Sequence, residues 1–203
     1  MFAWGDNEHG SCGTGALLDL YKAPRPLDYF AQLPGNDQAF RVFACGASSA
    51  VLTRLGKVFM WGLNDDGQLP FDLRDKVQSQ AVQTLPREVL LPAPITHMAM
   101  GRGTSAFVTD QGEAYISGLK LWSYPYKVPL PDNFFPVQAC CGEDYFAFVG
   151  QQGEVLAFGG PFPGAENRSQ DLPERPKLVE AGFFPGKVIV LRGAYDYCAT
   201  IVA

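Results

Sequence analysis

The strongest constraint on this chain is a repeated sequence unit, which occurs over residues 41–63, 96–118 and 137–159. In each copy a turn glycine stands six residues before a closing glycine, as Gly56 does before Gly62. Apolar and polar residues alternate on both sides of the turn, which predicts a hairpin of two short strands. A third strand is expected in the segment that leads to the upstream glycine. Because a lone hairpin is only marginally stable in water, such units are expected to stack around an axis.

The two ends of the chain carry complementary halves of the same unit. Residues 1–5 read as its second half, and residues 188–203 read as its first half. In a propeller, terminal strands that share one blade hide two sheet edges. We therefore expect an all-β fold: a single domain over residues 1–203, forming a small β-propeller of about four blades with the shared blade built from residues 188–203 and 1–5. The alternative is that the chain is an excerpt of a longer repeat array.

Proline supports this division, because none of the 16 prolines lies in the repeat cores or in the two half-units. Proline has no backbone donor for a sheet ladder, so its absence marks these segments as sheet. The connectors 6–40, 64–95, 119–136 and 160–187 hold all the prolines and differ in length. We expect them to be loops, and unequal loops on equal blades are where binding surfaces usually lie.

Composition argues against several classes of protein. The net charge of −5 disfavours binding to nucleic acid. The five cysteines form no CxxC pair, and with only two histidines they offer neither a zinc site nor a disulfide framework. No apolar run has the length of a transmembrane helix. The N-terminus lacks the features of a signal peptide. We therefore expect a cytoplasmic protein with no bound cofactor or metal and no direct membrane insertion.

No constellation of residues predicts catalysis. His9 has acidic neighbours, but its counterpart in the next repeat is Asp66, which indicates an ordinary turn position. The hydroxyl pairs Ser48-Ser49 and Thr104-Ser105 lack nucleophile-elbow spacing and are interpreted as turn hydroxyls. Cysteines at one shared repeat position, 45 and 141, are expected to pack against the central axis rather than to serve in redox chemistry. The chain is therefore not expected to be an enzyme.

Aromatic residues gather in the connector after the second repeat. Interface hot spots favour Trp and Tyr, so this segment is a candidate partner anchor, with packing inside the protein as the alternative. The candidate partner-binding residues are Trp122, Tyr124, Tyr126, Phe134, Phe135 and, on the next connector, Phe162.

Two segments, Trp4-Gly5-Asp6-Asn7-Glu8-His9-Gly10 and Trp61-Gly62-Leu63-Asn64-Asp65-Asp66-Gly67-Gln68-Leu69, match one another. Together with Cys45-Gly46 and Cys141-Gly142, they resemble the regulator of chromosome condensation repeat. The later units depart from the family pattern, since Trp-Gly becomes Ser117-Gly118 and Phe158-Gly159. The resemblance implies a β-propeller. The founding member of that family is an exchange factor for the small GTPase Ran and binds chromatin, and many relatives are protein-interaction platforms.

We therefore expect a non-catalytic structural or adaptor subunit of a larger protein assembly, which binds other subunits through its inter-blade loops. A cytoskeletal or ciliary complex would suit such a member, with a mitochondrial complex as the alternative. The alternative function is regulation of a small GTPase, by exchange or by binding.

Overall fold

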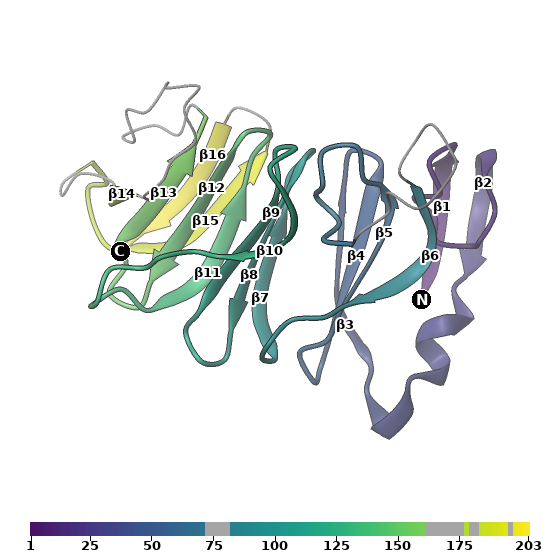
Figure 1. Ribbon diagram of the computed structural model, residues 1–203, viewed down its shortest axis with the longest axis horizontal. Coiled ribbons are helices and arrows are strands. Elements are labelled where there is room, and N and C mark those ends of the chain that lie inside the picture. Colours follow the sequence, from purple (N-terminus) through teal and green to yellow (C-terminus); the bar gives the residue numbers. More distant parts are fainter. Residues whose placement is uncertain (72–81, 161–176, 179–182, 195–196) are drawn as a thin grey trace.

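The computed structural model describes residues 1–71, 82–160, 177–178, 183–194 and 197–203. Antiparallel sheets follow one another along the chain like the blades of a fan (Figure 1). The first full blade contains β3 (Ala39–Cys45), β4 (Ser48–Thr53), β5 (Val58–Leu63) and β6 (Val82–Val89). The second contains β7 (Ile95–Met100), β8 (Thr104–Thr109), β9 (Ala114–Gly118) and β10 (Trp122–Lys127). The third contains β11 (Pro136–Cys141), β12 (Tyr145–Gly150), β13 (Val155–Gly159) and β14 (Lys177–Leu178). These sheets confirm the all-β propeller architecture.

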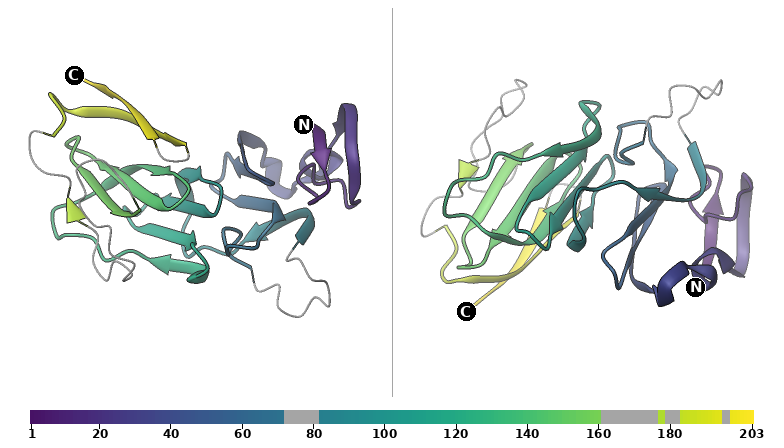
Figure 2. Two further views of the ribbon diagram at one scale, coloured as in Figure 1. Left: turned by 90° about the horizontal axis from the view of Figure 1, so that it is seen from above. Right: turned by 60° about the horizontal axis from the view of Figure 1, so that its bottom comes forward.

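The two ends of the chain form separate half-blades. β1 (Phe2–Asn7) pairs with β2 (Leu18–Pro26), and β15 (Val188–Ala194) pairs with β16 (Tyr197–Val202). These hairpins lie at opposite ends of the fan in both orientations (Figures 1 and 2). In the described structure residues 188–203 and 1–5 therefore lie in two separate sheets, and not in the one shared blade that the sequence predicts. Three full blades turn through only part of a circle, so the terminal strands do not meet.

The predicted turns owe their geometry to threonine and glycine. Thr53 Oγ1 accepts a hydrogen bond from the backbone N–H of Lys57 (3.1 Å), while the Gly56 N–H donates to the Thr53 carbonyl (3.1 Å). In the second blade, Thr109 Oγ1 likewise accepts from the Glu113 N–H over 3.0 Å. A positive φ of 79° at Gly56 closes the turn at little steric cost for glycine.

Each blade has a fourth, outer strand that the sequence pattern did not reveal. β2, β6 and β10 lie in connectors that we expected to be loops, and they contain Pro26, Pro86 and Pro125. Each is the last strand of its sheet in the described structure. Proline is tolerated there because an edge strand need not donate from every residue.

Both faces of the middle blades are buried. Phe107 packs in the cluster between the first and second full blades, whereas its neighbours Ala106 and Val108 pack in the cluster between the second and third. Side chains therefore alternate between two interfaces rather than between a core and solvent. Between β2 and β3, two short 3₁₀ helices (Asp28–Gln32 and Pro34–Asn36) place Phe30 5.6 Å from Phe59, ring centroid to ring centroid.

Candidate functional site

A recurring asparagine stabilises the conformation of the loops at one end of the blades. Asn64 Oδ1 accepts a hydrogen bond from the backbone N–H of Leu69 (2.6 Å), and Asn7 Oδ1 accepts from Cys12 (2.8 Å). Both asparagines are buried, so each side chain acts as an internal template for its loop. This explains the Asn-x-x-Gly motif in physical terms.

Each of these loops is also tied to the following blade. Trp61 Nε1 donates to the Ser11 carbonyl (2.8 Å), and Ser117 Oγ donates to the Gln68 carbonyl (3.2 Å). Ser11 and Gln68 hold equivalent repeat positions, as do Trp61 and Ser117. Although the second unit has serine in place of tryptophan, the hydrogen bond between the blades is therefore retained.

Replacing Trp61 with phenylalanine should lower the free energy of unfolding by about 1–2 kcal/mol, because the partly buried hydrogen bond to the Ser11 carbonyl is lost and the ring is smaller. Urea titration followed by circular dichroism measures this effect. Tyr126→Phe, which removes a polar group from an exposed ring, should change stability by less than about 0.5 kcal/mol. Equal effects of the two substitutions would contradict the assigned bond.

A rim of charged side chains lies at this same end of the blades, and we call it the loop rim: Asp66, Arg102, Lys120 and Glu143. Arg102 Nη1 lies 2.9 Å from Glu143 Oε1, and Lys120 Nζ lies 3.7 Å from Asp66 Oδ1. The rim borders a depression of about 250 Å³ and draws on all three full blades. In an antiparallel sheet, the turn between the first and second strands lies at the same end of the blade as the loop after the third strand. Residues far apart in sequence therefore meet at this end.

The backbone beside the loop rim is unusual. Leu119 and Lys120 have φ values of 56° and 59°, and they are the non-glycine residues with positive φ in the described chain. The Leu119 N–H donates to the Gly103 carbonyl, and the Lys120 N–H donates to the Asp66 carbonyl (2.7 Å). These bonds hold the left-handed conformation and fix the position of Lys120.

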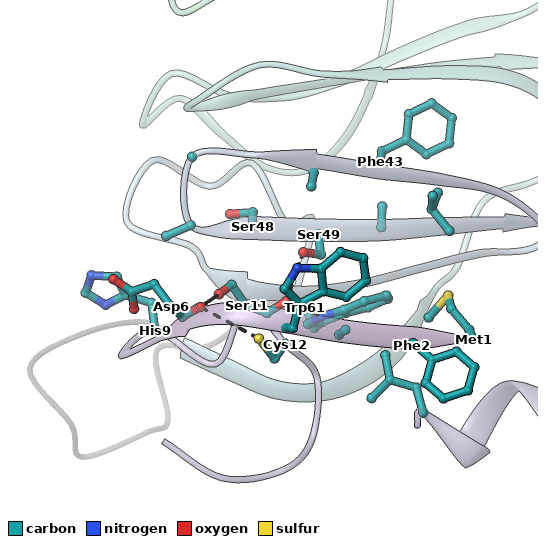
Figure 3. Close-up of a pocket in the computed structure, with 18 residues that line it drawn as sticks. Met1, Phe2, Asp6, His9, Ser11, Cys12, Phe43, Ser48, Ser49 and Trp61 are labelled. Carbon is teal, nitrogen blue, oxygen red and sulfur yellow. Dashed lines mark hydrogen bonds between the residues drawn. The ribbon is translucent and has the colours of Figure 1, made fainter. Parts of the chain in front are cut away.

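A larger groove, of about 490 Å³, lies between β1 and the inner strands β3 and β4 (Figure 3). One wall carries Phe43, Ser48 and Ser49, and the other carries Phe2 and Trp4. His9 lines its loop end, where its buried Nδ1 atom has no hydrogen-bond partner. The groove is more apolar than the loop rim.

The inner strands of the blades are joined by side chains. His97 Nδ1 accepts a hydrogen bond from the Ala139 N–H (3.0 Å), and Gln138 Oε1 accepts from the Leu191 N–H (3.1 Å). These strands line a cavity of about 360 Å³ that also contains Arg41 and Arg192. Burial, followed by the nearby charges of Arg192 and Arg41, lowers the pKa of His97 to about 4.

This arrangement predicts a stability that depends on pH. In the unfolded chain His97 takes up a proton near its ordinary pKa of 6.5, but in the folded chain it does so near 4. Between these values the unfolded state binds more protons, so stability should fall as pH falls, by as much as about 3 kcal/mol. His97→Gln places a glutamine at the position that Gln138 holds in the next blade. This substitution should reduce the change in the urea unfolding midpoint between pH 6.5 and pH 4. An unchanged pH slope would contradict the assignment.

Three of the four candidate hydroxyls have structural partners, whereas the buried Ser105 Oγ has none among the described residues. Ser49 Oγ donates to the Ser11 carbonyl, Ser48 Oγ to the Leu63 carbonyl, and Thr104 Oγ1 to the Gly142 carbonyl. Burial is the main cause that raises the pKa values of the Cys12, Cys45 and Cys141 thiols, which disfavours reactive thiolates. His9 lies in a turn, as its repeat position indicates. Within the described ranges no three His, Cys, Asp or Glu side chains gather as metal ligands.

The structure separates the predicted partner-binding residues. Trp122, Tyr124 and Tyr126 lie on the outer strand β10 rather than in a loop. Trp122 stacks on Tyr126 at 5.4 Å and packs edge-on against Phe146 at 6.1 Å. Tyr124 and Tyr126 are exposed, as is Phe135, whereas Phe134 is buried in the core between the second and third blades. Phe162 lies outside the described residues.

The comparisons with known proteins agree with this architecture. Residues 56–108 match the Regulator of chromosome condensation (RCC1) repeat. Mouse RCC1 domain-containing protein 1 is 28% identical over 181 residues, which are 89% of this chain and 44% of that protein. A bovine secretion-regulating guanine nucleotide exchange factor is 30% identical over 118 residues, which are 58% of this chain and 24% of that protein. The structure of Prp20p from Saccharomyces cerevisiae superimposes with a TM-score of 0.71 at 20% identity, over 98% of this chain and 50% of Prp20p.

The fold and its loops therefore define an all-β propeller protein built from repeated hairpin units. The chain contains a match to the RCC1 repeat over residues 56–108 and is similar to RCC1 domain-containing protein 1 along most of its length. It spans less than half the length of the mouse relative and half that of Prp20p. No helix in the described part of the chain has the length and hydropathy needed to cross a bilayer.

Proposed function

We propose that this chain regulates a small GTPase by binding it with the loop rim, without contributing a catalytic residue. The observation that carries the proposal is the rim itself, in which four charged side chains from three blades are held by ion pairs around a depression. The relatives support this choice, because one is named as a guanine nucleotide exchange factor. Prp20p, whose structure was described together with its binding to Gsp1p, shares the fold.

The rim suits recognition of a protein surface for a physical reason. Its side chains sit on turns fixed by buried hydrogen bonds, so little freedom is lost when a partner binds. Its mixed charges can select a partner of complementary pattern and raise the association rate. The site is therefore expected to recognise the pattern of charges on a partner protein rather than to bind a small molecule.

The test measures binding to a panel of small GTPases and the release of a fluorescent guanine nucleotide from each. The double exchange Arg102→Glu with Glu143→Arg keeps an ion pair but reverses the presented charges, and it should weaken binding about tenfold or more. The matched control exchanges Lys57 and Glu88, an exposed pair away from the rim, and should change binding less than about twofold. A panel with no binding and no faster release would refute the proposal.

A second candidate is an adaptor role in a protein assembly, favoured by the aromatic strand β10. Tyr124 is 52% exposed and Tyr126 is 44% exposed, on an outer strand. Rigid aromatic rings are common anchors of interfaces. A cytoskeletal or ciliary complex remains the proposed setting for this role, with a mitochondrial complex as the alternative.

Affinity purification with mass spectrometry tests the adaptor role. Tyr124→Ala should remove co-purifying subunits, while Trp122→Ala should also destabilise the fold because its ring packs on Phe146. If Tyr124→Ala retains every companion, β10 is not the anchor.

A further inference from the structure

We propose that the cavity between the inner strands, which we call the inner cavity, binds a small ligand that carries a phosphate group, through Arg41, His97 and Arg192. The cavity has a volume of about 360 Å³ and is bordered by β3, β7, β11 and β15. β11 contacts both β7 and β15, and β3 contacts β7. The inner cavity shares no lining residue with the loop rim, so this inference goes beyond the GTPase proposal and is independent of it.

The lining of the inner cavity is cationic. Arg41, His97 and Arg192 come from three different inner strands, β3, β7 and β15. No aspartate or glutamate is among the described residues of the lining. Arg41 and Arg192 form no ion pair with any residue that the structure describes. In a chain with a net charge of −5, two arginines that share a cavity without a carboxylate partner indicate a site for an anion.

The backbone around Arg192 is fixed on both sides. The preceding residue, Leu191, has its N–H and its carbonyl bonded to the side chain of Gln138, at 3.1 and 3.2 Å. At the following residue, Gly193, an added Cβ would lie 2.5 Å from the Cys141 carbonyl oxygen, so β15 lies directly against β11. Arg192 Nη1 also donates to the Leu191 carbonyl (3.0 Å), which leaves the other N–H groups of the guanidinium for a ligand. This preorganisation lowers the cost of binding.

His97 adds an uncharged hydrogen-bond donor to the two arginines. Its Nδ1 atom accepts a hydrogen bond from the Ala139 N–H (3.0 Å), which places the proton of the neutral ring on Nε2. The lowered pKa of His97 keeps the ring neutral near pH 7, and the charges of Arg192 and Arg41 contribute to this effect. All three side chains therefore offer N–H groups to a ligand, while the ring acceptor Nδ1 is already occupied.

Two guanidinium groups and one N–H donor suit a phosphate group. A phosphate monoester carries a charge of about −1.5 to −2 at pH 7 and three acceptor oxygens, and arginine binds such oxygens in pairs. A carboxylate, with a single charge, would offset only one of the two arginines. The volume of the cavity is near the lower end of the range of small-molecule pockets, about 300–1,000 Å³. It therefore suits inorganic phosphate or a small phosphate monoester.

Proton NMR tests the site in the unmodified protein, because the chain has only two histidines and His97→Gln assigns the resonances of both. Inorganic phosphate, added at pH 7.5 and constant ionic strength, should shift the His97 resonances in a saturable way and leave those of His9 unchanged. Acetate should bind at least about tenfold more weakly. No saturable shift of His97, equal shifts of both histidines, or equal binding of acetate would overturn the proposal.

Glycerol phosphate distinguishes the two sources of the phosphate group in the same titration. Tighter binding than that of inorganic phosphate would assign the site to a monoester, and weaker binding would assign it to the free anion.

Substitution of the arginines tests their part in binding by calorimetry. Arg41→Gln and Arg192→Gln each remove one charge, and each should weaken phosphate binding by about tenfold or more. Arg87→Gln is the matched control, because Arg87 also lies over a phenylalanine ring, 4.7 Å from the Phe71 centroid, but on the outer strand β6. It should change binding less than about twofold. Equal effects of all three substitutions would contradict the assigned site. If one cavity variant does not fold, the other and the NMR titration decide.

Discussion

Replacing Gly62 with alanine should lower the free energy of unfolding by about 3 kcal/mol or more, which is a large part of the stability of a typical domain. Two costs add at this position. The φ of 103° is unfavourable for an L-residue, and the new Cβ would lie 2.2 Å from the Ala47 carbonyl oxygen and 2.8 Å from Ser48 Cα. Both neighbours are backbone atoms, one in the turn between β3 and β4 and one at the start of β4. Relief of the clash therefore requires the sheet to move.

Urea unfolding followed by circular dichroism measures this loss. Gly35→Ala serves as the control, because Gly35 also has a positive φ (72°) but nothing lies within 4 Å of its added Cβ. Its free energy of unfolding should fall by only about 1–2 kcal/mol. If Gly62→Ala is obtained only as unfolded protein, a cooperative thermal unfolding transition of the Gly35→Ala variant still shows that the loss at Gly62 is the larger of the two. Equal losses in two folded variants would show that close approach of the strands is not what requires glycine.

Replacing Phe107 with alanine should cost about 3–5 kcal/mol, because it leaves a cavity between the first and second full blades. The ring is fully buried and belongs to the cluster that contains Met98 and Tyr115. Stacked blades cannot close such a gap easily, since each is held by its own ladder of hydrogen bonds.

Chemical denaturation, read from near-ultraviolet circular dichroism, checks the Phe107 prediction. Leu90→Ala removes an apolar side chain that is 86% exposed, and should change stability by less than about 0.5 kcal/mol. A loss at Phe107 as small as that at Leu90 would mean that the blades do not pack as described.

Glycine spacing and alternation predicted the three inner strands of each blade because these features report local geometry. A closing glycine indicates a positive φ. In the first two blades, the threonine three residues before the turn glycine accepts a hydrogen bond from the backbone N–H that follows the turn. The outer strands escaped prediction because Pro86 and Pro125 are normally signals of a loop. Their place at a sheet edge, where proline is tolerated, depends on the whole blade.

The candidate sites were harder to predict because they depend on contacts between blades. Arg102 and Glu143 meet across two blades although 41 residues separate them in sequence. Likewise, His97 accepts a hydrogen bond from the Ala139 N–H on the next inner strand, although 42 residues separate the two in sequence.

Hydrogen exchange read by mass spectrometry, with and without a GTPase selected from the panel, tests the functional proposal most directly. The loop-rim proposal predicts slower exchange on binding in residues 64–69, 101–103, 119–121 and 142–144, which carry the rim. The charge-reversed pair at Arg102 and Glu143 should abolish this protection, while the exchanged Lys57–Glu88 pair should retain it. Protection confined to β10, or no protection in any segment, would contradict binding at the loop rim.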